Sequence, residues 1–346
     1  MKYTRLPNTD IKVSKICLGT MTFGEQNTEK EAHQQLDFSL ENGINFIDTA
    51  EFYAVPGRAE TQGLTETYIG NWLHKRNSRD QMVLATKVAG PGRDLDYIRK
   101  NLGYSKEAIH EAIDKSLKRL QTDYIDLYQL HWPDRNANFF GQRGYKYADN
   151  EQWSDNVKTV IETLNDLVKQ GKIRHYGLSN ETPWGVMHHL NESDRYQLTR
   201  AKTIQNPYSL LNRTYEIGLA EISSRENIGL LPYSPLAFGY LSGKFLHGKR
   251  PKDSRISLFP QMSRYNNDKV VKAVEKYAAL ADKYNLNLAQ MSLAFINQQD
   301  FVTSTIIGAT TLKQLEENSN SIHINLSDEI LKEIEKIHEM QPNPAP

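Results

Sequence analysis

The segment Ile125-Asp126-Leu127-Tyr128-Gln129-Leu130-His131 is a largely apolar run that ends on a histidine. Two earlier runs end in the same way, one on Asp48 after Asn45-Phe46-Ile47 and one on Lys87 after Met82-Val83-Leu84-Ala85-Thr86. Short runs of this kind are typical of parallel strands buried on both faces. If the strands are neighbours in a barrel, Asp48, Lys87 and His131 meet at its C-terminal mouth, with Tyr53 close behind. These four side chains together predict acid–base chemistry.

Strand-like runs alternate with helical patterns along most of the chain. We expect eight strands, centred on residues 16–18, 46–48, 83–87, 125–131, 173–179, 203–205, 230–234 and 304–307. Eight strands with helices between them favour a (β/α)₈ TIM barrel, of the α/β class, over an open sheet. Residues 2–6 and 12–14 flank a turn and predict a hairpin that caps the barrel floor. The expected organisation is one domain over residues 1–346, with the hairpin in 1–15, the barrel in 16–325 and a C-terminal helix and tail in 326–346.

Helix boundaries are clearest at two places. Residues 155–170 repeat apolar side chains at intervals of three and four, and Gly171 is suited to the left-handed residue that follows a helix. A second helix is predicted to begin after Ser105, whose hydroxyl is a preferred N-cap.

Two long connections follow the third and fourth strands, at residues 88–104 and 132–154. The second is rich in aromatic side chains, which argues against disorder. Because both connections lie on the expected active face, we interpret them as walls of a substrate pocket. The alternative is that the aromatic side chains only pack a loop that covers the barrel.

Composition narrows the classes of partner. The 346 residues include 42 basic and 42 acidic side chains, so charge gives no argument for nucleic acid or membrane as a partner. Cys17 is the one cysteine, and it allows neither an intramolecular disulfide nor a cysteine metal site. The N-terminus lacks the apolar segment of a secretory signal and no run is long enough to span a membrane, so we expect a cytoplasmic protein. Oligomeric state stays open.

Two other cofactor sites are disfavoured. The chain has no G-x-G-x-x-G motif between a strand and a helix, because the glycines Gly19 and Gly24 do not fit that spacing. No His-Glu-x-x-His motif is present, and the adjacent His188 and His189 would point about 100° apart on a helix. We therefore expect neither a Rossmann domain nor a metal site.

Several motifs resemble those of the aldo-keto reductases. In chain order they are Gly43-Ile44-Asn45-Phe46-Ile47-Asp48-Thr49-Ala50-Glu51-Phe52-Tyr53, Glu66-Thr67-Tyr68-Ile69-Gly70, Asp126-Leu127-Tyr128-Gln129-Leu130-His131-Trp132-Pro133, Gly171-Lys172-Ile173-Arg174, Gly177-Leu178-Ser179-Asn180, Tyr233-Ser234-Pro235-Leu236 and Ile307-Gly308-Ala309-Thr310. The last two, with Ser242-Gly243-Lys244, are most similar to the branch that includes bacterial general reductases and potassium-channel β subunits. The motifs run from residue 16 to about 318, nearly the whole chain.

The chain also departs from the family pattern. The stretch between Tyr53 and Glu66 is longer than usual, and Glu181 stands where many relatives carry an aromatic residue. Gly308-Ala309 replaces a Lys-Ser pair, and Gln314 replaces an arginine that binds the cofactor phosphate in other branches. These changes bear on the preference for NADP more than on catalysis.

The resemblance implies hydride transfer from NADPH to the carbonyl carbon of an aldehyde or ketone. Tyr53 is the implied proton donor. The free side chain has a pKa of about 10, which the Lys87 cation is expected to lower. Asp48 would hold Lys87 in place, and His131 would polarise the substrate oxygen. Each residue alone has an ordinary structural explanation; the prediction rests on their placement at consecutive strand ends.

The remaining implied residues bind cofactor or substrate. Ser179, Asn180 and Gln205 would contact the nicotinamide carboxamide and Tyr233 would stack on its ring. Ser234, Pro235, Leu236, Ala237 and Phe238 would line the pyrophosphate, and Lys244 and Arg255 would bind phosphates. Thr310, Gln314, Glu317 and Asn318 would hold the adenosine end, although Glu317 and Asn318 also fit ordinary helix-surface polarity. The other expected cofactor contacts are Thr20, Met21, Gly239, Leu241, Gly243, Ile307 and Gly308. The expected pocket walls are Phe23, Phe52, Trp132, Phe139 and Phe140, which suit an apolar or aromatic small-molecule carbonyl substrate.

Two alternatives stand beside the reductase. One is a regulatory or redox-sensing subunit that binds NADP(H) and turns over little, which the branch resemblance keeps open. The other is a (β/α)₈ lyase or isomerase that uses no nicotinamide.

Overall fold

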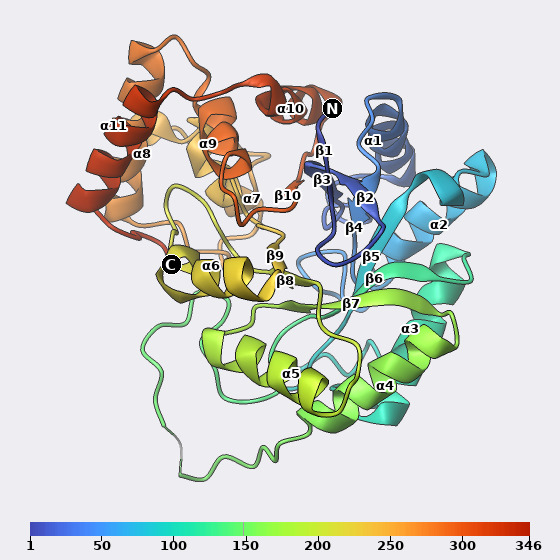
Figure 1. Cartoon of the computed structure of the whole chain (residues 1–346). Coiled ribbons are helices and arrows are strands. Elements are labelled where there is room, and N and C mark those ends of the chain that lie inside the picture. Colours follow the sequence, from blue (N-terminus) through green and yellow to red (C-terminus); the bar gives the residue numbers. More distant parts are fainter. Residues whose placement is uncertain (148) are drawn as a thin grey trace.

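The computed structural model describes residues 1–147 and 149–346. Its centre is a parallel sheet in the order β10-β3-β4-β5-β6-β7-β8-β9 (Figure 1). The strands are β3 (Ile16–Gly19), β4 (Phe46–Asp48), β5 (Val83–Val88), β6 (Ile125–Leu130), β7 (Ile173–Ser179), β8 (Thr203–Gln205), β9 (Gly229–Leu230) and β10 (Thr305–Ile307). From β3 to β9 each strand pairs with the next along the chain, and β10 pairs with β3, as in a (β/α)₈ barrel.

The barrel is closed between β9 and β10. Leu230 N donates a hydrogen bond to Phe301 O at 2.9 Å, and Thr303 N donates to Leu230 O at 2.9 Å. Further up, Ile306 N donates to Pro232 O at 3.0 Å. The closure leaves no free sheet edge, so all the strand ends on one side of the barrel point into one mouth.

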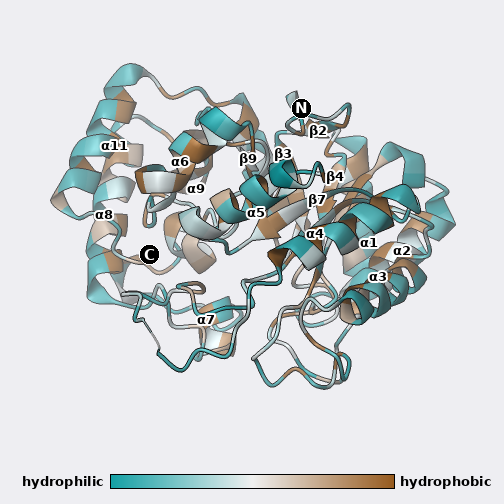
Figure 2. Ribbon diagram, turned by 60° about the horizontal axis from the view of Figure 1, so that its bottom comes forward, coloured by the Kyte–Doolittle hydropathy of each residue, from teal (hydrophilic) through white to brown (hydrophobic). Residues whose placement is uncertain are grey.

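Helices surround the strands and carry hydrophilic turns on their outer sides (Figure 2). They are α1 (Glu29–Glu41), α2 (Leu64–Arg76), α3 (Lys106–Leu120), α4 (Val157–Lys169), α5 (Pro183–Arg195), α6 (Tyr215–Glu226), α7 (Arg255–Leu258), α8 (Asp268–Lys283), α9 (Leu288–Asn297), α10 (Leu312–Asn320) and α11 (Asp328–Met340). Short 3₁₀ turns are η1 (Arg79–Gln81), η2 (Ala237–Ser242), η3 (Leu246–Gly248) and η4 (Ser321–His323). Helices α8 and α11 lie side by side (Figure 1). Among the described residues, none of the helices is long and apolar enough to cross a membrane.

The barrel floor is closed by the predicted N-terminal hairpin. Strands β1 (Tyr3–Arg5) and β2 (Lys12–Ser14) pair antiparallel, with Thr4 opposite Val13. Leu6, Ile11 and Val13 of this hairpin belong to one buried cluster with the inward-facing side chains of the barrel, which are Cys17, Phe46, Val83, Ala85, Leu127, Leu231 and Ile306. This apolar plug occupies the lower barrel and leaves the polar strand ends to the mouth.

The predicted helix ends are confirmed. The Ser105 side chain accepts a hydrogen bond from Ala108 N at the start of α3. Gly171 follows α4 with a φ of +74°, the left-handed conformation for which glycine is suited. The strand predicted around residues 230–234 is regular only as far as Leu230, where β9 ends. Beyond it, Leu231 N still donates to Ile204 O at 2.8 Å and Tyr233 N to Asn206 O at 3.1 Å, before Ser234 turns to a φ of +53°.

The two long loops share a small core of their own. Ala89, Leu95, Ile98 and Trp132 form a buried cluster, against which Phe52, Tyr97, Leu102, Phe139 and Phe140 pack. The Trp132 indole N–H donates to Pro91 O at 3.1 Å. Some of these aromatic rings therefore pack the loops together, as the alternative interpretation held, while others also face a cavity described below.

Gly70 provides a test of the packing between α2 and α3. A β-carbon at this position would lie 2.1 Å from Arg119 O and 2.9 Å from Leu120 Cα, both backbone atoms of α3. We expect Gly70→Ala to lower the free energy of unfolding by about 1–3 kcal/mol, because the two helices must move apart. Urea denaturation measures the change. The matched control is Gly218→Ala on α6, where the nearest atom is a Pro183 side-chain carbon at 3.3 Å; an equal loss there would contradict this account.

Candidate active site

Asp48 and Lys87 form a fully buried ion pair in the barrel mouth. Lys87 Nζ donates to Asp48 Oδ2 at 2.6 Å and to Thr49 O at 2.8 Å, and the Lys87 side chain has no exposed surface. They come from the neighbouring strands β4 and β5, whose register places Ala85 beside Asp48. The predicted role of Asp48 in positioning Lys87 thus agrees with the geometry.

Tyr53 lies beside this pair and faces His131. Lys87 Nζ is 3.4 Å from Tyr53 Oη, so one ammonium group contacts both the carboxylate and the phenol. The rings of Tyr53 and His131 meet edge to face with their centroids 5.9 Å apart. The structure therefore brings together all four of the residues predicted to be catalytic.

Burial and the neighbouring charges together shift the pKa values of Tyr53, His131 and Lys87. It raises the pKa of Tyr53 above its ordinary value, and the Lys87 cation opposes this rise without cancelling it. Burial lowers the pKa of His131 well below its usual value, and Lys87 and Arg93 add to the effect. For Lys87, burial acts to lower the pKa, but Asp48 and Tyr53 outweigh it and the pKa is raised. At neutral pH the mouth thus holds a phenol, a neutral imidazole and an ammonium group.

The expectation of a lowered Tyr53 pKa is therefore wrong for this structure. The Lys87 cation acts in the expected direction, but the loss of water around the phenol is the larger effect. A phenol that stays protonated is the form that gives a proton to a developing alkoxide.

Gln129 belongs to the site but was not among the predicted residues. Its Nε2 donates to Asp48 Oδ1 at 3.1 Å, and Gln205 Nε2 donates to the same oxygen at 2.8 Å. Gln205 thus lies in the mouth, as expected for a residue that contacts the nicotinamide, but its amide N–H already donates a hydrogen bond to Asp48. Gln129 could have been found by counting two residues back from His131, since alternate residues of a strand face the same side.

The turn that carries Tyr53 is fixed by a second buried ion pair. Glu51 Oε1 accepts hydrogen bonds from Ala89 N at 2.7 Å and from Arg99 Nη2 at 3.1 Å. The side chains of Glu51 and Arg99 are 1% and 0% exposed. This pair ties residues 50–53 to the 88–104 loop. Neither residue was singled out from the sequence, because the partners are 48 positions apart.

A cavity of about 940 Å³ opens above the catalytic residues, the upper part of the range for small-molecule sites. Asp48, Tyr53 and His131 line it, with Lys87 buried beneath. The predicted pocket residues Phe52, Trp132 and Phe140 line it too. So do most of the predicted cofactor residues: Thr20, Met21, Ser179, Asn180, Gln205, Tyr233, Ser234, Pro235, Leu236, Phe238, Gly239, Lys244, Arg255, Ile307, Gly308, Thr310, Gln314, Glu317 and Asn318.

Five of the predicted cofactor and pocket residues do not line the cavity. Ala237 and Leu241 are fully buried in the main core, and Gly243 ends η2 with a φ of +77°. Phe23 was expected in a pocket wall but is a fully buried core residue. Phe139 stacks edge to face behind Phe140, at 5.2 Å between centroids. The pocket-wall prediction for Phe23 is therefore wrong, because its side chain lies in the core. The cofactor contacts of Ala237, Leu241 and Gly243 stay predictions, since a backbone contact does not need the side chain to line the cavity.

The far part of the cavity is suited to an anion. Burial lowers the pKa of Arg255, and burial together with the nearby Arg255 lowers the pKa of Lys244. Across residues 1–147 and 149–346, neither side chain forms an ion pair with a carboxylate. Asp253 acts on Lys244 through space without an ion-pair contact among the described residues, and two adjacent cations are expected where a phosphate binds. Beside them, Phe238 and Gly239 have φ values of +55° and +93°, and the Gly239 N–H donates a hydrogen bond to Leu236 O at 2.8 Å.

Comparison with known proteins agrees with this geometry. The sequence pattern of the Aldo/keto reductase family matches residues 15–339. The chain belongs to the aldo/keto reductase family. It is 50% identical to protein Tas of Escherichia coli over the full length of both chains. It is 34% identical to the uncharacterized oxidoreductase YrpG of Bacillus subtilis, covering 97% of this chain and 96% of that one. A probable voltage-gated potassium channel β subunit of Arabidopsis thaliana is 29% identical, with 99% and 98% covered.

Family membership and relatives named as oxidoreductases make this protein an oxidoreductase. Members of the aldo/keto reductase family generally use NAD(P)H, and the paired cations of the cavity fit the phosphates of such a cofactor.

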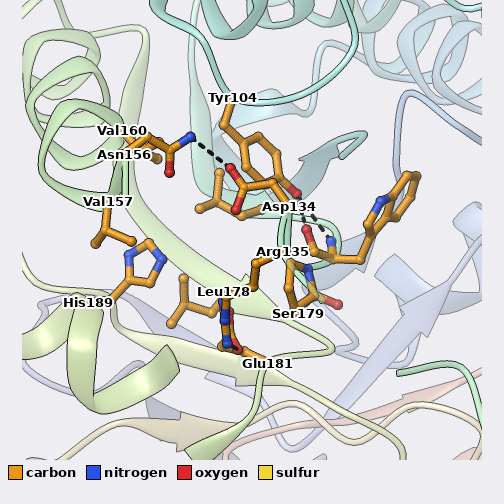
Figure 3. A pocket seen from close by; sticks show the side chains of 13 residues that line it. Tyr104, Asp134, Arg135, Asn156, Val157, Val160, Leu178, Ser179, Glu181 and His189 are labelled. Atoms are coloured by element: carbon orange, nitrogen blue, oxygen red, sulfur yellow. Dashed lines mark hydrogen bonds and ion pairs between the residues drawn. The ribbon is translucent and has the colours of Figure 1, made fainter. Parts of the chain in front are cut away.

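The protein has a second, much smaller cavity beside α4 and α5, shown in Figure 3. Its volume is about 10 Å³, no more than one water molecule needs. Glu181, the departure noted in the sequence, lies here and accepts two hydrogen bonds from Arg135, at 2.6 and 3.0 Å. This paired contact ties the loop after β6 to the end of β7. The buried His189 also lines this cavity.

The buried His189 predicts how the free energy of unfolding of this protein depends on pH. Burial, and next the Arg135 charge, lower its pKa from about 6.5 to about 3. Above pH 6.5 the ring is neutral in both states. Below that pH the unfolded chain takes up a proton that the folded chain does not, so acid favours unfolding. At pH 5 the loss is up to about 2 kcal/mol.

Urea denaturation at pH 7.5 and pH 5 checks this expectation. His189→Gln should lose less stability than the wild type between the two pH values. The exposed His323→Gln is the matched control and should behave as the wild type does. A His189→Gln variant with an unchanged pH dependence would contradict the assignment.

Proposed function

We propose that this protein reduces aldehydes or ketones to alcohols with NADPH. The observation that carries the proposal is the contact of Tyr53 Oη with the buried Lys87–Asp48 pair, at the floor of a cavity large enough for a cofactor and a substrate. A bound nicotinamide cofactor supplies the hydride for the carbonyl carbon.

Tyr53 donates the proton. The alkoxide that forms from the carbonyl needs a proton from a group within hydrogen-bonding distance, and Tyr53 is a buried phenol whose pKa is raised by burial. The Lys87 ammonium stabilises the tyrosinate left behind, and Asp48 keeps that ammonium in place. His131, held neutral by burial, orients the carbonyl oxygen toward Tyr53 through a hydrogen bond.

The cofactor residues follow the lining of the cavity. Asn180 and Tyr233 form the nicotinamide end, where Tyr233 Oη donates to Asn180 Oδ1 at 2.6 Å. Lys244 and Arg255 would bind phosphate groups. The preference for NADPH over NADH rests on these two cations, because Gln314 bonds to Thr310 N at 3.0 Å and brings no charge.

The test is a fluorescence titration of the purified protein with NADPH and NADH, followed by oxidation of the bound cofactor with a panel of aldehydes and ketones. We expect tighter binding of NADPH and its consumption by at least one carbonyl class. Tighter binding of NADH would overturn the cofactor assignment. A protein that binds neither nucleotide would favour a lyase or isomerase.

A second candidate is a redox-sensing subunit that binds NADP(H) and turns over slowly. The similarity to the plant channel β subunit favours it. Tight NADPH binding without consumption by any carbonyl compound would support this candidate.

A further inference from the structure

Three arginines line the cavity on the side of the long loops. Arg93 belongs to the 88–104 loop, Arg143 to the loop after β6, and Arg264 to the segment between α7 and α8. In the part of the chain that the structure describes, none of the three forms an ion pair with a carboxylate. None was predicted from the sequence, since loop direction cannot be read from spacing.

An aromatic wall connects these arginines to the catalytic residues. The centroid of the Phe52 ring lies 6.0 Å from that of His131 and 6.2 Å from that of Trp132, and Trp132 lies 6.0 Å from Phe140. The Arg93 guanidinium stands over Phe140 at 4.7 Å and over Trp132 at 5.6 Å. A planar apolar group along this wall would run from His131 to Arg93.

Arg264 approaches the same space from across the cavity. Its Nε lies close to the turn at Gly141, where a β-carbon would be only 2.8 Å away. It also lies near Tyr233, whose pKa burial raises to about 12 against the opposing charge of Arg264. Arg264 therefore stands between the loop after β6 and the nicotinamide end.

The charges that line the cavity are unbalanced on this side. The side-chain carboxylates of the lining are Asp48, Asp253 and Glu317. Asp48 is paired with Lys87, Asp253 acts on Lys244, and Glu317 lies on α10 at the adenosine end. Among the described residues, none of these three side chains forms an ion pair with Arg93, Arg143 or Arg264.

We propose that the substrate is an aldehyde or ketone whose flat, apolar body carries an anionic group, a carboxylate or a phosphate. Its anion would lie among Arg93, Arg143 and Arg264, and its body would lie on the aromatic wall. Guanidinium groups bind both kinds of anion through paired hydrogen bonds. This inference rests on the proposed reductase function and deepens it.

The experiment compares matched aldehydes with the NADPH-loaded enzyme. The anionic probes are 4-formylbenzoate and 4-formylphenyl phosphate, and the neutral probe is methyl 4-formylbenzoate. We expect kcat/KM to be about 10- to 100-fold higher for at least one anion than for the ester. The anion with the larger preference identifies the carboxylate or the phosphate as the natural group.

Single Arg→Gln variants locate the effect. Arg93→Gln, Arg143→Gln and Arg264→Gln should each lower the ratio of kcat/KM for the preferred anion over the ester. Arg225→Gln on α6, which removes an exposed arginine paired with Glu221, should leave the ratio unchanged. If Arg264→Gln weakens NADPH binding and leaves the ratio alone, Arg264 belongs to the cofactor and its assignment here is overturned.

The outcomes separate the two proposals. Equal kcat/KM for anions and ester, with turnover of both, overturns the substrate inference and keeps the reductase. If no aldehyde is reduced, the reductase proposal fails, and calorimetric binding of 4-formylbenzoate to the wild type and to Arg93→Gln decides this inference. Binding to the wild type that is about tenfold or more weakened in the variant would support the anion site, while equal or absent binding would overturn it.

Discussion

Tyr53→Phe is expected to lower kcat for carbonyl reduction by about 10²- to 10⁴-fold, the usual contribution of a positioned proton donor. The change removes one oxygen atom, and the phenyl ring retains its packing against His131 and Phe52. Lys87 keeps its contacts with Asp48 and Thr49, so the mouth should keep its shape. Steady-state kinetics with NADPH and the best aldehyde of the panel measure the loss.

Cofactor affinity distinguishes a lost proton donor from a damaged site. The Kd for NADPH in Tyr53→Phe should stay within about twofold of the wild type, a difference of less than 0.5 kcal/mol. Tyr284→Phe, which removes a surface phenol bonded to Glu333, is the matched control and should retain wild-type kcat. Unchanged turnover in Tyr53→Phe would show that the proton comes from another group.

Lys87→Met is expected to affect both activity and stability. It leaves the Asp48 carboxylate buried without its cation, which typically costs about 3–5 kcal/mol in the free energy of unfolding. The hydrogen bonds from Gln129 and Gln205 remain and keep the loss toward the lower end of that range. Turnover should fall at least as far as in Tyr53→Phe, because the tyrosinate loses its neighbouring charge. Urea denaturation and steady-state kinetics provide the two readouts.

The double variant Asp48→Asn/Lys87→Met separates these effects. With the carboxylate neutralised, most of the lost stability should return, since no unpaired charge is buried. Activity should not return, because the cation beside Tyr53 is still missing. Recovery of both quantities together would mean that Lys87 has only a structural role.

Much of the site could be predicted because strands impose a regular direction on side chains. Phe46 and Asp48, like Ala85 and Lys87, are two residues apart, so each pair faces the barrel interior, with the apolar member lower and the polar member in the mouth. The same alternation would have assigned Gln129 to the site. A rule that considers only the last residue of each strand does not find Gln129, which lies two positions earlier than His131.

The loops were predicted less well for a physical reason. Their direction depends on contacts between residues far apart in the chain, such as Glu51 with Arg99 and Arg135 with Glu181. A sequence gives no period from which such partners can be found. The aromatic content of the two long loops indicated a pocket wall, but it did not show that Arg93 faces the cavity. In the same way, nothing in the sequence around Phe23 showed that this side chain lies in the core.

Because of the Glu51–Arg99 pair, the 88–104 loop should tolerate fewer sequence changes than the loop after β6. The 88–104 loop contributes Arg93 to the cavity lining and also, through Arg99, holds the turn that carries Tyr53. Insertions or exchanges in this loop should displace the turn that carries Tyr53 unless the new loop again places an arginine beside Glu51. Residues 137–147 include pocket residues such as Phe140 and Arg143 but make no hydrogen bond to Glu51 among the described contacts. New specificities should therefore arise more readily by variation in that segment.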